Sequence, residues 1–165
     1  MGTGKTISSA TISRVLSALR TAVIGPAIAK WNWYGDMTEN WGYNPMNWTI
    51  LEANKRKTMF ALKERFVVLN YEILQKYEKY VNKDKIDHFI VDECHRAKNT
   101  TTKTFKNLSR IVKQHPKAKI TLLTGTPITN RVTDLFAYLK LCGHPLGKNR
   151  KKFEDMYAVK TRTKI

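Results

Sequence analysis

Cysteine, acidic residues and long apolar runs are all scarce in this chain. It has only two cysteines in 165 residues, Cys94 and Cys142, and they form no C-x-x-C pair. This gives no sign of a disulfide framework and fits a reducing compartment. No apolar run approaches the length that spans a bilayer, and the N-terminus lacks the charged and apolar regions of a signal peptide. We therefore expect no membrane partner and a cytoplasmic location, or a nucleoid or nuclear one.

The shortage of acidic side chains leaves a large positive charge. Thirteen Asp and Glu oppose 30 Lys and Arg, for a net charge of +17. Such an excess favours polyanionic partners, because binding releases their counterions. A basic surface kept for solubility, or one compensated by an acidic partner chain, would give the same count. Nucleic acid is the leading candidate partner. The 42% apolar content, with few Gly and Pro, excludes a disordered or fibrous chain and fits one globular domain.

Short apolar runs alternate with amphipathic segments along the chain. This alternation predicts an α/β fold, with a mainly parallel sheet flanked by helices and a ligand site at the carboxyl ends of the strands. The expected strands are residues 21–24, 48–51, 66–69, 86–91 and 119–123. The expected helices are residues 6–19, 27–40, 54–64, 101–112 and 134–141, one that ends near residue 80, and one near 153–159. Aromatic residues within 31–43 suit either a core or stacking on bases.

An acidic pair, Asp92 and Glu93, follows the apolar run at residues 86–91. At a strand end, one carboxylate can hold Mg²⁺, directly or through water, while the other orients a water for attack on a phosphate. The pair alone is weak evidence, since acidic pairs also follow apolar runs in surface loops.

The segment Gly4-Lys5-Thr6, before a helical stretch, has the pattern of the second half of a phosphate-binding loop. In such a loop, backbone N–H groups surround phosphate oxygens, the lysine reaches the phosphates, and the threonine hydroxyl ligates Mg²⁺. Gly2 and Thr3 precede it as further loop residues. The full pattern places its first glycine two residues before the chain begins, and no strand precedes the loop, which predicts a truncated sequence. A chance match in a Gly-rich tail is the alternative.

Together these motifs resemble the Swi/Snf-type ATPases of helicase superfamily 2, specifically their first RecA-like lobe. Five segments carry the resemblance in order. They are residues 1–6 (motif I), Gly25-Pro26 with Trp33 (motif Ia), residues 66–72, residues 90–99 (motif II) and residues 122–130 (motif III). Cys94 departs from the alanine usual in motif II, and a small apolar thiol should be tolerated there.

The resemblance implies a Mg-ATP site. Lys5 would contact the ATP phosphates, Thr6 and Asp92 would hold Mg²⁺, and Glu93 would position the attacking water as general base. A further set of residues would couple the nucleotide state to bound DNA: His95, Thr124, Gly125, Thr126, Pro26 and Trp33.

The resemblance also implies a P-loop NTPase lobe at residues 1–147, without its first strand, and a basic extension at 148–165 that leads towards a second RecA-like lobe. That second lobe would supply arginines to the transition state. We expect the missing strand to leave a gap inside the sheet and to make these residues marginally stable by themselves.

Two functions remain open on this basis. One is the ATP-binding lobe of a DNA-dependent ATPase that moves along or remodels nucleic acid, with double-stranded DNA as partner. This chain alone would then be weak or inactive. The other is a catalytically silent, basic nucleic-acid-binding module that keeps the fold. A small-molecule kinase is disfavoured because nothing in the sequence resembles a lid.

Overall fold

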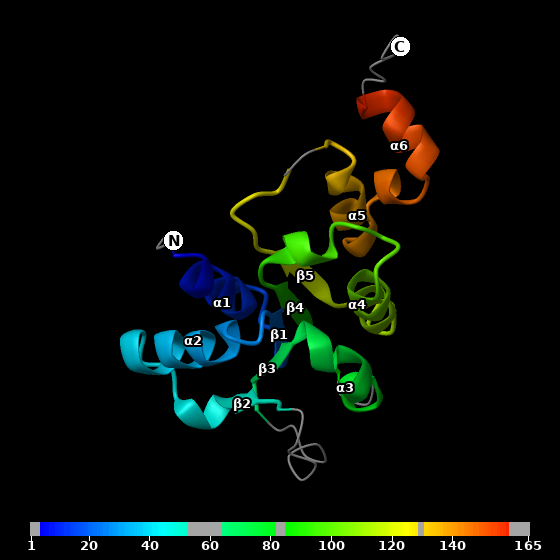
Figure 1. The fold of residues 1–165 in the computed structure, drawn as a ribbon. Helices are drawn as coiled ribbons and strands as arrows, with labels where there is room; N and C mark the ends of the chain where they lie inside the picture. Colours follow the sequence, from blue (N-terminus) through cyan, green and yellow to red (C-terminus); the bar gives the residue numbers. More distant parts are fainter. Residues whose placement is uncertain (1–3, 53–63, 82–84, 129–130, 159–165) are drawn as a thin grey trace.

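The computed structural model describes residues 4–52, 64–81, 85–128 and 131–158 (Figure 1). The elements follow in the order α1 (Lys5–Val15), β1 (Thr21–Gly25), α2 (Ala29–Gly35), β2 (Trp48–Ile50), β3 (Phe66–Asn70), α3 (Leu74–Val81), β4 (His88–Val91), α4 (Lys103–Lys113), β5 (Lys119–Leu122), α5 (Asp134–Leu141) and α6 (Arg150–Tyr157). A π-helical turn, Asp36–Asn40, extends α2. The helix expected at 54–64 falls almost wholly outside the described residues. No helix in the described ranges is long and apolar enough to cross a membrane.

The five strands form one sheet in the order β2-β3-β1-β4-β5, and every neighbouring pair is parallel. This confirms the predicted α/β fold. In the central register, Val23 of β1 lies between Val68 of β3 and Ile90 of β4. The expectation of a gap inside the sheet is wrong for the described strands, because each is hydrogen-bonded to its neighbour in this order. The free edges of the described sheet are those of β2 and β5.

Each face of the sheet is covered by its own helices (Figure 1). On one face Val23 and Ile90 pack with Trp33 and Met37, which come from α2 and the π-helical turn after it. On the other face Val91 and its neighbours pack against α3, α4 and α5. Side chains alternate between faces along a strand, so continuous apolar runs such as Phe66–Asn70 are buried on both sides. This explains why the strands were recognisable from sequence.

Helix α1 packs on the sheet mainly through small residues. The apolar residues at mixed helical spacings within 6–19 predict a helix packed on a sheet, and Ala10 and Ile7 do contact the core. Val15 and Ile12, however, are 79% and 39% exposed. The fully buried positions of the helix are Ser9, Ala10 and Ser13. The serine hydroxyls can be buried because they donate to carbonyls one turn earlier in the helix. A small-residue face lets α1 approach the strands closely.

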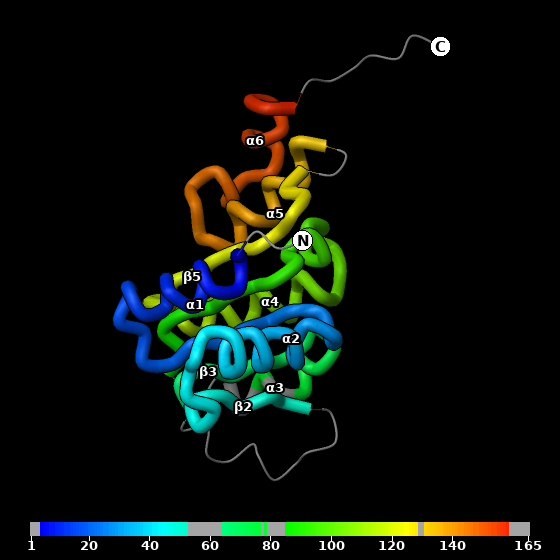
Figure 2. Tube along the Cα trace, turned by 90° about the vertical axis from the view of Figure 1, so that its left-hand side faces the viewer, coloured from blue at the N-terminus to red at the C-terminus, as the bar shows by residue number. Residues whose placement is uncertain are grey.

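Helices α5 and α6 lie beyond the β5 side of the sheet, as the turned view shows (Figure 2). Phe153 of α6 is buried against Phe136 of α5, with ring centroids 5.7 Å apart. Gly147 sits in the turn between these helices, and a Cβ there would lie 2.4 Å from the backbone nitrogen of Lys140. Only glycine fits that approach. The boundary expected after residue 147 stays a prediction.

Candidate functional site

The carboxyl ends of the parallel strands bring four segments of the chain together. Strand β1 ends at Gly25, β3 at Asn70, β4 at Val91 and β5 at Leu122. Because the strands are parallel, the residues that follow them meet at one edge of the sheet. Asp92 and Glu93 come directly after β4, near the middle of that edge.

Asp92 is held by contacts from several elements. Its Oδ2 accepts a hydrogen bond from the indole Nε1 of Trp33 at 2.9 Å, and its Oδ1 accepts one from the backbone N–H of Glu93 at 2.9 Å. Its backbone carbonyl accepts from the hydroxyl of Tyr71 at 2.7 Å, and its backbone N–H donates to Ile24 at 2.7 Å. The carboxylate therefore has a defined orientation before any ligand arrives.

Gly25, at the end of β1, lies directly against Asp92. A Cβ at position 25 would be 3.3 Å from the Cβ of Asp92, closer than side chains normally pack. The carbonyl of the next residue, Pro26, accepts a hydrogen bond from Ala29 at the start of α2, at 3.0 Å. The Gly-Pro pair thus leaves room for Asp92 and begins the turn into the helix that carries Trp33.

Glu93 has a left-handed backbone conformation, with φ of 47°. Residues with a Cβ seldom adopt this region, and those that do are concentrated at functional sites. Its carboxylate is partly exposed, and Oε2 lies 3.1 Å from Nδ1 of His95. The strained backbone thus presents the second carboxylate at the surface beside an imidazole.

The segment after β5 is attached to the acidic segment. The backbone N–H of Cys94 donates to the carbonyl of Leu123 at 2.9 Å, and the hydroxyl of Thr124 lies 3.4 Å from Nδ1 of His95. The N–H of Thr126 in turn donates to the Thr124 hydroxyl at 3.1 Å. Between these threonines Gly125 is exposed, and no atom of the described residues lies within 4 Å of the place a Cβ would take. The segments that resemble motifs II and III are therefore in direct contact.

Burial keeps Cys94 neutral at this junction. The side chain is 1% exposed, and desolvation raises the pKa of its thiol to about 12. A protonated thiol behaves as a small apolar side chain. The cysteine therefore packs where motif II usually has alanine, as the sequence predicted.

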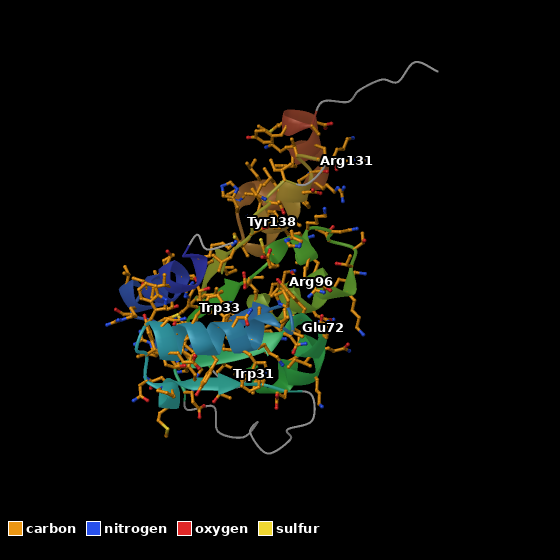
Figure 3. The ribbon with its side chains drawn as sticks, turned by 60° about the vertical axis from the view of Figure 1, so that its left-hand side comes forward. Trp31, Trp33, Glu72, Arg96, Arg131 and Tyr138 are labelled. Atoms are coloured by element: carbon orange, nitrogen blue, oxygen red, sulfur yellow. The ribbon has the colours of Figure 1, made fainter. Side chains whose placement is uncertain are left out.

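Tyr71, which supports the Asp92 carbonyl, is steadied by a polar pair at the surface. Burial raises the pKa of its hydroxyl above the ordinary value, so the group remains a hydrogen-bond donor. The guanidinium of Arg96 stacks over its ring at 5.7 Å and pairs with Glu72 at 3.5 Å. A hydrogen bond from Asn70, with help from Arg96, lowers the pKa of the Glu72 carboxyl. Figure 3 shows Arg96 and Glu72 next to each other.

The phosphate-loop residues are only partly connected to this cluster. Gly4 precedes α1 in the left-handed conformation, with φ of 67°, and Lys5 and Thr6 form the first turn of the helix. Within the described ranges, neither of these two side chains bonds to Asp92 or Glu93. Gly2 and Thr3 lie outside the described residues. The structure therefore brings together motifs Ia, II and III, and the role of the loop stays a prediction.

Sequence reasoning missed two members of the site, Gly25 and Tyr71. Both lay in recognised segments, yet neither was assigned a role. The one available signal was position, because each lies within two residues of the end of a predicted strand. Trp33 was recognised, but its contact with Asp92 joins residues 59 positions apart and depends on how α2 packs.

Known proteins resemble this chain over most of its length. The nuclear protein STH1/NPS1 of Saccharomyces cerevisiae is 29% identical over 95% of the chain, and the DNA repair protein rhp54 of Schizosaccharomyces pombe is 26% identical over 78%. The chain spans 12% and 16% of the length of these relatives.

A solved structure shares the fold. The Sulfolobus solfataricus SWI2/SNF2 ATPase core in complex with dsDNA superimposes with a TM-score of 0.76 at 22% identity, covering 94% of this chain and 32% of that one. The SNF2-related domain matches residues 1–164. The resemblance found in the motifs is therefore confirmed, and the chain belongs to the SNF2-related domain family.

Proposed function

We propose that this chain is the ATP-binding lobe of a DNA-dependent ATPase that moves along or remodels nucleic acid. The observation that carries the proposal is the fixed Asp92 carboxylate beside the exposed Glu93 carboxylate, at the sheet edge where α/β folds bind ligands. The family supports it, since several relatives are named as chromatin-remodelling ATPases.

The side chains at the sheet edge suit Mg²⁺. Asp92 offers carboxylate oxygens, and each takes one N–H from the protein, which leaves a lone pair for the metal or for a water bound to it. The Thr6 hydroxyl, in the first turn of α1, would be the other protein ligand. When bound with ATP, the ion would neutralise charge on the phosphates.

Each remaining residue has a role that its chemistry allows. The Lys5 ammonium would bind ATP phosphate oxygens. Glu93 would accept a proton from the attacking water, because its partly exposed carboxylate can be reached by a water molecule. His95 of motif II and Thr124 of motif III lie 3.4 Å apart and would relay the state of the nucleotide towards bound DNA. Pro26, Trp33, Gly125 and Thr126 belong to the same coupling set.

Double-stranded DNA is the partner that we propose. The net charge of +17 favours a polyanion, and the matched Sulfolobus structure is described as a complex with dsDNA. In the proposed protein, residues 1–147 form this lobe, and the basic segment 148–165 leads towards a second RecA-like lobe. That second lobe completes the ATP site. We propose that the protein is located with the DNA, in the cytoplasm or nucleoid, or in the nucleus of a eukaryote.

The test is ATP hydrolysis by the full-length protein with and without duplex DNA, for the natural sequence and for Glu93→Gln. We expect DNA to stimulate turnover and the substitution to lower it by about 10²- to 10⁴-fold, the range typical of losing a general base. DNA binding should persist in the variant. Binding without any turnover in the natural protein would instead support the silent nucleic-acid-binding module.

A further inference from the structure

Trp33 donates a hydrogen bond to the Asp92 carboxylate from 59 positions earlier in the chain, and its own side chain is tightly packed. The side chain is 3% exposed and packs in the core beneath α1 and α2 with Val23, Met37 and Ile90. Its Nε1 lies 2.9 Å from Oδ2 of Asp92. A donor fixed by its own packing can impose a direction on its acceptor.

We propose that Trp33 is a positioning residue for the metal site, and that its indole N–H sets the plane of the Asp92 carboxylate towards Mg²⁺. The proposal rests on the proposed function. The terminal torsion of an aspartate is broad, so one hydrogen bond leaves the carboxylate free to turn. Glu93 holds Oδ1 and Trp33 holds Oδ2, so the two donors together fix the plane. Gly25, which has no Cβ, leaves the space that the Asp92 side chain occupies in this orientation.

A second tryptophan in the same core shows that packing alone does not require this bond. Trp48 is 6% exposed and stacks on Phe66, and its buried Nε1 has no hydrogen-bond partner among the described residues. Trp31 and Trp41 are exposed at 55% and 56%. Figure 3 shows Trp33 and Trp31 at separate places on α2. Within the part of the chain that the structure describes, the tryptophans thus comprise one indole bonded to Asp92, one buried indole without a partner, and two exposed ones.

The first experiment needs no catalysis. In ¹⁵N-labelled chain, the four indole N–H signals are assigned with Trp→Phe variants. We expect the Trp33 signal to lie furthest downfield and to be the slowest of the four to exchange with deuterium, because its acceptor is charged. Asp92→Asn should move this signal more than the other three. Addition of MgCl₂ with ADP should also move it selectively. A Trp33 signal that Asp92→Asn leaves in place would overturn the proposal.

The second experiment measures Mg²⁺ dependence in the full-length protein. Trp33→Phe keeps most of the packing and loses the donor, so the Mg²⁺ concentration for half-maximal ATP hydrolysis should rise about 10- to 100-fold, as for other groups that orient metal ligands. The KM for ATP at saturating Mg²⁺ should stay nearly unchanged. Trp48→Phe is the matched control, since it removes an indole from the same core and should leave the Mg²⁺ dependence as it was.

The outcomes separate this inference from the proposed function. Suppose that the natural protein is active, and that Trp33→Phe is folded by circular dichroism and keeps the natural Mg²⁺ dependence. That result overturns the positioning role alone. Natural protein without any hydrolysis refutes the proposed function, while the response of the Trp33 signal to Asp92→Asn still decides whether the indole holds that carboxylate.

Discussion

Strand β4 has an aspartate just beyond each end, and each aspartate accepts two N–H hydrogen bonds from the protein. Before the strand, Oδ2 of Asp87 accepts from the backbone N–H groups of Leu19 and Arg20, both at 3.0 Å. After the strand, the oxygens of Asp92 accept from Glu93 and Trp33. Counting hydrogen bonds does not distinguish a structural carboxylate from a functional one.

Position in the sheet makes the difference between the two ends. At the amino end, the fully buried His88 bonds to Ser13 of α1 through Nδ1, at 2.6 Å, and to Thr121 of β5 through Nε2, at 2.8 Å. That end ties three elements together inside the protein. At the carboxyl end, Asp92 and Glu93 are only partly buried and stand where ligands bind in parallel sheets. We therefore expect changes at the amino end to affect stability and changes at the carboxyl end to affect function.

The largest contrast should come from Asp92→Asn compared with Asp87→Asn. At position 92 an amide loses the charge that attracts Mg²⁺, so we expect ATP hydrolysis by the full-length protein to fall about 100-fold or more. At position 87 the remaining amide oxygen can still accept the two N–H groups, so turnover should stay within about twofold. Steady-state assays on both variants, side by side, measure this. Equal losses in the two variants would contradict the assignment of the two ends.

How far the sequence predicts this molecule differs between the strands and their contacts. The strand at 21–24 and the helix at 134–141 were placed to within a residue, because apolar runs and periodicity are local signals. The buried face of α1 was predicted only in part, since Ser9 and Ser13 are fully buried beside Ala10 while most of its larger apolar residues are exposed. The contact of Trp33 with Asp92 also has no local signal, because it depends on the placement of a whole helix on the sheet.

The second prediction concerns the buried histidine at the amino end. His88→Leu should lower the free energy of unfolding by about 1–3 kcal/mol, because the hydroxyls of Ser13 and Thr121 lose their shared partner. Urea denaturation followed by circular dichroism measures this. His144→Leu, at an exposed position, is the control and should cost less. If the chain with His88→Leu still binds MgADP with natural affinity, the amino end of β4 contributes to stability and not to nucleotide binding.

The smallest effect should be a dependence of stability on pH that begins at the same histidine. Burial lowers the pKa of His88 below 6.5, its ordinary value, so the folded chain keeps the ring neutral where the unfolded chain protonates it. The unfolded state then binds more protons, and the stability conferred by the neutral ring is lost as the pH falls below about 6.5 and on towards the folded pKa. The loss should reach at most about 1.4 kcal/mol per pH unit.

Urea midpoints between pH 7.5 and 5.5 should fall less steeply in His88→Leu than in the natural chain. Parallel slopes would show that protonation of this ring does not contribute to the pH dependence of stability.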